Sequence, residues 1–225
     1  MRTFSKATIG FASAGILMAV LAGCSTTAAA PAATTGSSSA PSSAVEAPLA
    51  SIPALSGVDT SVLLDADFAA ALGTLGLTPG VVGTATLEEG ALHFPITGGN
   101  VDYFDPNGTV RPYVQGSIEH DGSGFSLTAG DTVVDLTNFT IDPATSELFG
   151  DVAVNGETAA TQVKVFDLYG GTLEPLQMDG DNAILTGTTV HISAEAAGLL
   201  NSTFNTDAVA DQLLVGIATI TVATK

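Results

Sequence analysis

The feature that most constrains the fold of this chain is the alternation of apolar and polar residues that starts near Val81 and continues to the C-terminus. Successive side chains of a β-strand point to opposite faces of a sheet, so a period of two indicates strands with one buried face. Segments rich in Gly, Asn and Asp interrupt the alternation, and such residues favour turns. The pattern therefore predicts a mainly β domain of consecutive antiparallel strands.

The turn segments predict where neighbouring strands pair. Asn155-Gly156 lies between two apolar runs and is the strongest hairpin signal in the chain. Asp121-Gly-Ser-Gly124 predicts a second hairpin, between a strand that ends at Glu119 and one that starts at Phe125. The predicted strands cover residues 84–87, 91–96, 100–104, 113–119, 125–128, 132–141, 147–154, 161–168, 183–192 and 214–222.

Two or three short helices accompany these strands. Apolar residues recur near helical spacing over residues 65–75. Ser193 is a residue type favoured at the N-cap, and it precedes a helix over residues 194–200 that ends near Asn201. Residues 207–213 are expected to form a further turn or short helix. The whole pattern predicts a single antiparallel β-sandwich or barrel-like domain, because so many strands with open edges would pair with other chains.

Composition sets limits on the core and on the partners. Hydrophobic residues make up 45% of the chain and the mean hydropathy is +0.41, which is enough for a core. Tryptophan is absent and aromatic residues make up only 6%, so Val, Leu, Ile and Ala should fill that core. The chain has 23 acidic residues and 5 basic ones. Such an acidic surface repels the phosphates of nucleic acids and of anionic lipids, so no nucleic-acid partner is expected.

The N-terminus has the order of features found in a secretory signal. Arg2 and Lys6 are the only charges before the single cysteine, Cys24. The apolar run after Lys6 is shorter than the ~20 residues that span a bilayer. Leu21-Ala22-Gly23-Cys24 resembles the lipobox of bacterial lipoproteins. The resemblance implies a signal peptide over residues 1–23, cleavage before Cys24, and acyl chains on Cys24 that hold the exported protein at the outer face of the cell membrane.

Residues 24–55 are mostly Ala, Ser, Thr and Pro, with neither helical nor strand periodicity. This composition predicts a disordered tether between the lipid anchor and a β-rich globular domain over residues 56–225. A single cysteine forms no internal disulfide, and its lipidation leaves no thiolate for a metal. The domain must therefore be stable without either.

The sequence contains no pattern typical of a catalytic or metal site. It has neither a Gly-x-Ser-x-Gly elbow nor a phosphate-binding glycine loop. His93, His120 and His191 are far apart and form no short metal-ligand pair. The segments at Asp121 and Asp179 have residue types that bind calcium, but short Asp-Gly segments are more often turns. We therefore expect neither catalytic residues nor a metal, and a domain that is not an enzyme.

One longer stretch resembles a known family. Residues 116–127, followed by residues 132–138, are similar to part of the HtaA-type domain of actinobacterial haem uptake, and residues 185–190 are similar to its closing segment. The domain also resembles uncharacterised secreted actinobacterial proteins. The resemblance implies a haem site, for which the candidates are His120, Tyr113 and Tyr103. The chain lacks the family's tryptophans, and the family's haem-ligating tyrosine has no assigned counterpart among the tyrosines here.

Three hypotheses for function follow. The first is a lipid-anchored envelope protein with a non-catalytic binding or structural domain, attached to the membrane through Cys24. The second is a surface lipoprotein that binds haem or another small ligand. The third is a secreted hydrolase whose residues come from several strands. Convergence of His, Tyr and Asp side chains in one enclosed pocket would count against the first.

Overall fold

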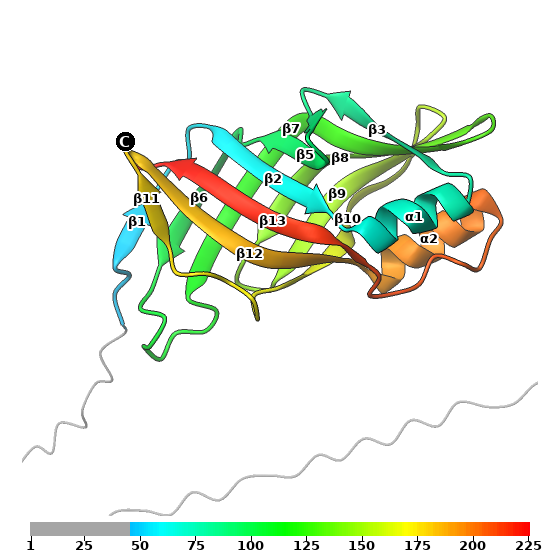
Figure 1. Ribbon diagram of the computed structural model, residues 1–225. Helices are drawn as coiled ribbons and strands as arrows, with labels where there is room; N and C mark the ends of the chain where they lie inside the picture. The colour runs from blue at the N-terminus through cyan, green and yellow to red at the C-terminus, as the bar shows by residue number, and fades with distance from the viewer. Residues whose placement is uncertain (1–45) are drawn as a thin grey trace, which may run out of the picture. The chain divides into compact units, whose positions relative to one another are not determined.

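The computed structural model describes residues 46–225, which form a mainly β structure with two helices, α1 (Ala66–Thr74) and α2 (Ala194–Phe204) (Figure 1). The mainly β prediction is confirmed, and 13 strands join in one antiparallel sheet. The strands are β1 (Ala50–Ile52), β2 (Val58–Leu64), β3 (Thr78–Gly83), β4 (Thr86–Glu88), β5 (Ala91–Pro95), β6 (Gly98–Tyr103), β7 (Val114–Ala129), β8 (Thr132–Asp142), β9 (Glu147–Val154), β10 (Glu157–Tyr169), β11 (Gln177–Asp179), β12 (Asn182–Ile192) and β13 (Leu214–Ala223).

The sheet curls because residues 91–103, a nearly continuous stretch, form hydrogen bonds first with β2 and then with β7. β5 pairs with β2, and β6, which follows after only two connecting residues, pairs with β7. The two connecting residues continue both ladders. The N–H of Ile96 donates to the carbonyl of Val58 at 3.2 Å, and that of Thr97 donates to the carbonyl of Glu119 at 2.8 Å. The result is a curled antiparallel half-barrel, and the sandwich alternative is not confirmed.

The inner face of the curled sheet forms the core. On β8 the buried residues are Val134, Leu136, Phe139 and Ile141. Their spacing changes after Leu136 because Asn138 has a φ of +53° at a β-bulge, where the ladder with β9 shifts register. Alternation therefore predicts the buried face of β8, and the bulge changes its phase.

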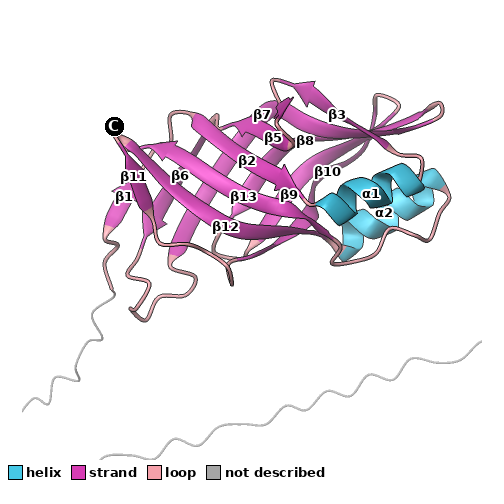
Figure 2. Ribbon diagram, viewed as in Figure 1, coloured by secondary structure: helices cyan, strands magenta, loops and turns pink. Residues whose placement is uncertain are grey.

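The two helices lie together at one end of the half-barrel (Figure 2). The carboxylate of Asp65 accepts hydrogen bonds from the N–H groups of Asp67 and Phe68 at 2.9 and 3.2 Å, so the predicted first helix begins at its N-cap. Ser193 caps α2 as predicted. This helix continues past the predicted end, to Phe204. It ends there because Asn205 takes the left-handed conformation of a C-terminal cap. Residues 207–213 form no helix, so the helix alternative is wrong, whereas the turn alternative is found at Asp211-Gln212.

The predicted hairpin at Asp121 is also wrong, because β7 runs through it as one strand of 16 residues. Both halves of β7 pair with β8 on one side, and the ladder is irregular only between His120 and Gly124. On its other side the first half pairs with β6 and the second with β3. The turn-forming residues thus make a bulge within one strand.

Four strands lie where none was predicted: β1, β2, β3 and β11. β1 comes from the segment expected to be the tether, and it pairs with β6. The Asn155-Gly156 hairpin between β9 and β10 is confirmed. Within residues 46–225, no helix has both the length and the apolar character needed to cross a membrane.

Candidate ligand cavity

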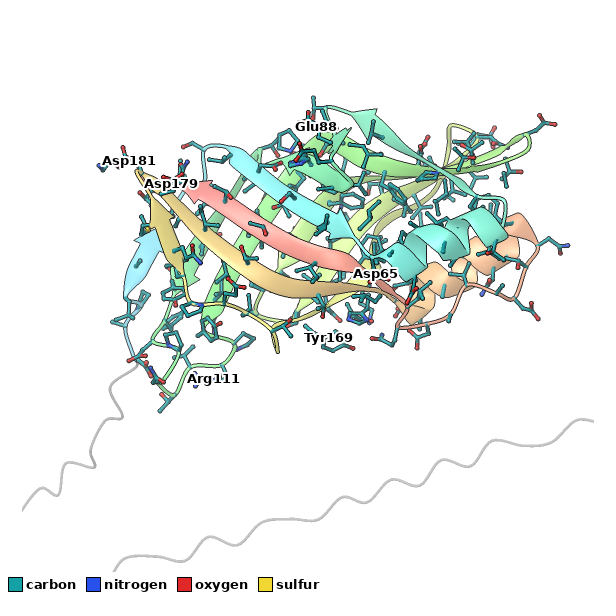
Figure 3. The ribbon with its side chains drawn as sticks, viewed as in Figure 1. Asp65, Glu88, Arg111, Tyr169, Asp179 and Asp181 are labelled. Atoms are coloured by element: carbon teal, nitrogen blue, oxygen red, sulfur yellow. The ribbon has the colours of Figure 1, made fainter. Side chains whose placement is uncertain are left out.

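The end of the half-barrel away from the helices contains a cavity of about 620 Å³. Its walls come from β1, β6, β7, β8, β10, β11, β12 and β13, together with the loop before β7, the turn after β8 and the loop after β10. Figure 3 places Arg111 on a loop at this end and Asp65 at the opposite end, where α1 begins. The volume lies within the range of roughly 300–1,000 Å³ that small-ligand pockets have.

The walls of the cavity are aliphatic. Inward-facing residues of five strands line its interior, and these are Val101, Ile118, Ile141, Leu185, Ile220 and Val222. Leu173, Leu176 and Met178 add an apolar wall from the loop after β10 and from β11. Met178 is 59% exposed although it lines the cavity, so this wall borders the opening to solvent. The strand alternation thus leads to an apolar hollow rather than to a fully packed core at this end.

Two tyrosines meet at the cavity. Tyr103 ends β6 and Tyr113 directly precedes β7, and their rings lie edge to face with centroids 5.8 Å apart. Burial raises the pKa of Tyr103, and the neighbouring Tyr113 and Asp105 add to the rise. The phenolate form of Tyr103 is therefore disfavoured. The structure brings together two of the three residues predicted for a haem or small-ligand site.

Arg111 supplies a positive charge at the cavity. Its guanidinium donates to the carbonyls of Val110 and Pro106 at 2.6 and 2.8 Å. A guanidinium has five N–H donors, so these two contacts hold the group in place and leave others for a ligand. Among residues 46–225 it has no carboxylate partner, whereas Lys164 and Lys225 each form ion pairs.

His120, the third predicted residue, lies deeper and does not reach this cavity. It is 1% exposed and borders a smaller apolar cavity of about 50 Å³. Its Nδ1 lies 3.3 Å from the carbonyl of Phe139, which can only accept, so Nδ1 carries the proton. Its Nε2 then accepts from the hydroxyl of Thr60 at 2.8 Å. Burial lowers the pKa of His120 to about 4, which keeps the ring neutral at pH 7.

The two cavities adjoin each other. Ile141, Leu168, Thr188 and Ile220 line both. The apolar space therefore continues inward from the larger cavity toward His120, with aliphatic side chains as the boundary.

The remaining candidates lie elsewhere. The Nδ1 of His93 is 2.6 Å from the carboxylate of Asp59, and His191 packs against Tyr169 with ring centroids 5.0 Å apart. Within the described range no group of three or more His, Cys, Asp or Glu residues is arranged to hold a metal. Cys24 lies outside the described residues.

The sequence reasoning missed Arg111 and the apolar wall of Leu173, Leu176 and Met178. Arg111 carries one signal, since it is one of only five basic residues in a strongly acidic chain. Leu173, Leu176 and Met178 have no such signal in the sequence, because three spaced apolar residues in an irregular segment show no regular period.

The comparisons with known proteins concern the fold. No protein-family profile matches the chain, and no curated protein matches it. The C-terminal domain of HtaA from Corynebacterium glutamicum is similar over 76% of this chain and 98% of that domain, with 14% identity and a TM-score of 0.52. The heme binding protein HtaB from the same organism is similar over 77% of this chain and 96% of its own, with 9% identity and a TM-score of 0.47. The first similarity shows that this chain shares the fold of the HtaA domain.

Proposed function

We propose that residues 46–225 form a non-catalytic binding domain that holds a largely apolar small molecule in the cavity. The observation that carries this proposal is the cavity of about 620 Å³, with aliphatic walls and with Tyr103, Tyr113 and Arg111 as polar groups at one side. Ligand pockets in proteins have this character, with a mainly apolar lining and a few polar groups that orient the ligand.

Haem is the first ligand to test. The HtaA-type resemblance in the sequence implies haem, and the shared fold supports that resemblance. The cavity has the residue types to fit it: Arg111 for an acidic substituent, a phenol for the iron, and aliphatic walls for the ring. Tyr113 is the better iron ligand of the two tyrosines, because the raised pKa of Tyr103 opposes phenolate formation.

We also propose that the domain is exported and held at the outer face of the cell membrane by lipid on Cys24. The support is the lipobox-like Leu21-Ala22-Gly23-Cys24 at the end of an apolar run with a basic start. The chain enters the domain at the cavity, since β1 lines it. A tether on β1 would thus join the anchor to the end of the domain that binds the ligand.

The test is a titration with two ligands, haemin and the neutral dye Nile red. We expect a shift of the haemin absorption band and a rise of dye emission at micromolar concentrations. Ala183→Phe places a ring in the cavity and should abolish both signals, whereas Ala91→Phe, on β5 outside the cavity, should leave both unchanged. Tyr113→Phe should change the haemin spectrum, with Tyr169→Phe, outside the cavity, as its control.

Each outcome bears on a different part of the proposal. If the folded protein binds neither ligand, the cavity is not a binding site and the proposal is wrong. Dye binding without a haemin shift supports the cavity and rejects haem. Ligand binding that Ala183→Phe does not change places the site elsewhere and also contradicts the proposal.

A further inference from the structure

The side chains that line the cavity favour one shape of ligand over another. The residues that line it include only two aromatic rings, those of Tyr103 and Tyr113, and the rest of the apolar surface is aliphatic. Aromatic faces give a flat conjugated ligand a stacking partner, whereas aliphatic walls give each methylene of a flexible chain a similar gain on burial. The lining therefore favours a hydrocarbon chain.

The depth of the apolar space favours the same ligand. Ile141, Leu168 and Ile220 separate the larger cavity from the smaller one and line both. Aliphatic side chains move between staggered rotamers, so this boundary can yield to a narrow chain. A chain of sufficient length would extend inward toward Phe94 and Phe139, where a wide rigid ring system would not pass.

The charge at the cavity indicates the head group. Arg111 is fixed by two backbone carbonyls and has no carboxylate partner among residues 46–225. The other two bases in this range are already paired: Lys164 lies 3.2 Å from Asp167, and Lys225 lies 2.6 Å from Asp181. A carboxylate or phosphate forms strong charge-assisted hydrogen bonds with a guanidinium. Arg111 is thus placed to bind an anion whose apolar part is in the cavity.

We propose that the cavity binds a single-chain anionic amphiphile, with the hydrocarbon tail inside and the carboxylate or phosphate head on Arg111. This inference rests on the proposed function, because it names the ligand class of the same cavity. The head group could belong to a free fatty acid or to a lysophospholipid, and the chemistry that Arg111 recognises is common to both.

The experiment measures the displacement of a dansyl-labelled fatty acid from the full chain carrying Cys24→Ser, which has no acyl chain of its own to compete. Palmitate, palmitoyl lysophosphatidic acid and neutral hexadecanol are compared as competitors. We expect the two anions to displace the dye at concentrations at least about tenfold lower than the alcohol, because one charge-assisted pair accounts for about that factor. The difference between palmitate and the lysophospholipid identifies the preferred source of the anion.

Arg111→Gln isolates the head-group contact. Arg111 is exposed and lies in a loop, so this change should leave the fold intact. We expect it to bring palmitate and hexadecanol to equal affinity, while the affinity for hexadecanol stays the same. The matched control is Lys225→Gln, which removes a nearby cation that is already paired with Asp181 and should preserve the preference for anions.

Chain length tests the inner extension. In a series of fatty acids, each additional buried methylene should tighten binding about fourfold until the tail reaches the end of the space. Thr188→Leu, at the boundary between the cavities, should move this plateau to shorter chains. A plateau that Thr188→Leu leaves in place contradicts the extension.

Several outcomes would overturn the inference and leave the proposed function standing. One is haemin binding without any displacement by palmitate. Another is equal displacement by palmitate and hexadecanol in the unchanged protein, or a preference for anions that survives Arg111→Gln. Absence of binding by haemin, Nile red and the dansyl fatty acid alike would overturn the proposed function itself.

Discussion

At the scale of single residues, hydrogen bonding decides what His120 can do. The sequence makes it a ligand candidate, but the carbonyl of Phe139 and the hydroxyl of Thr60 occupy both ring nitrogens. The side chain stabilises the interior as a neutral ring, and the two tyrosines alone remain at the cavity. A residue's type in a sequence indicates the chemistry available to it, whereas its partners decide whether that chemistry is free.

The burial of His120 predicts that the stability of the domain depends on pH. The pKa of His120 falls from 6.5 to about 4 on folding, so the unfolded chain takes up its proton first as the pH decreases. The stability contributed by the neutral ring is present above pH 6.5 and is lost as the pH falls toward 4. The expected loss is roughly 3 kcal/mol. Denaturant unfolding measured between these pH values should show the loss, and His120→Gln should reduce it.

A matched control separates this effect from the titration of the carboxylates. His191→Gln replaces a partly exposed ring and keeps the buried His120, so the loss of stability toward pH 4 should persist in this variant. If His120→Gln and His191→Gln give the same profile, the lowered pKa of His120 does not contribute to stability.

At the scale of elements, long-range partners decide which turn signals become turns. Gly122 forms hydrogen bonds with distant parts of the chain. Its N–H donates to the side-chain oxygen of Asn138 at 2.9 Å, and its carbonyl accepts from the N–H of Thr84 at 3.1 Å. These contacts stabilise a bulge inside β7 and not a hairpin. Asn155-Gly156 does form its hairpin, because its two strands pair with each other. The sequence marks a break in regular pairing at both places, and only the partners distinguish them.

The start of α2 gives the prediction at this scale. The hydroxyl of Ser193 accepts from the N–H of Ala196 at 3.0 Å and donates to the carbonyl of Lys164 at 2.8 Å, in a site with no solvent exposure. Ser193→Ala removes both hydrogen bonds and should lower the free energy of unfolding by about 1–2 kcal/mol. Ser202→Ala, on the exposed side of the same helix, should change it by less than about 0.5 kcal/mol. Equal effects in chemical denaturation would show that the cap is not important.

At the scale of the whole molecule, the two ends of the half-barrel are built differently. The helices cover one end, and the cavity with Arg111 lies at the other (Figures 1 and 3). β1 brings the chain into the domain at the cavity end, where the N–H of Leu49 donates to the carbonyl of Tyr103 at 2.7 Å. The described part of the chain therefore begins at the end of the half-barrel that contains the proposed ligand site.

The anchor itself is the prediction at this scale. Cells that produce the full chain should yield a mature protein that begins at Cys24, carries acyl chains and stays with the membrane fraction. Each buried methylene contributes ~0.8 kcal/mol, so two or more acyl chains suffice for stable attachment. Mass spectrometry of the N-terminal peptide is the measurement, and Cys24→Ser should release the protein from the membrane. An uncleaved or unlipidated N-terminus would contradict the prediction.

By itself, the sequence determined the β class, the cap at Ser193, the Asn155-Gly156 hairpin and the buried face of strands such as β8, because each depends on neighbours a few residues away. Only the tertiary structure decided that the sheet curls, that β7 is continuous, and that Tyr103, Tyr113 and Arg111 meet beside an apolar cavity. Those features depend on contacts between strands far apart in the chain, such as β2 with β13 and β1 with β6. A local period does not encode these pairings, since it states which face of a strand is buried but not which strand lies opposite.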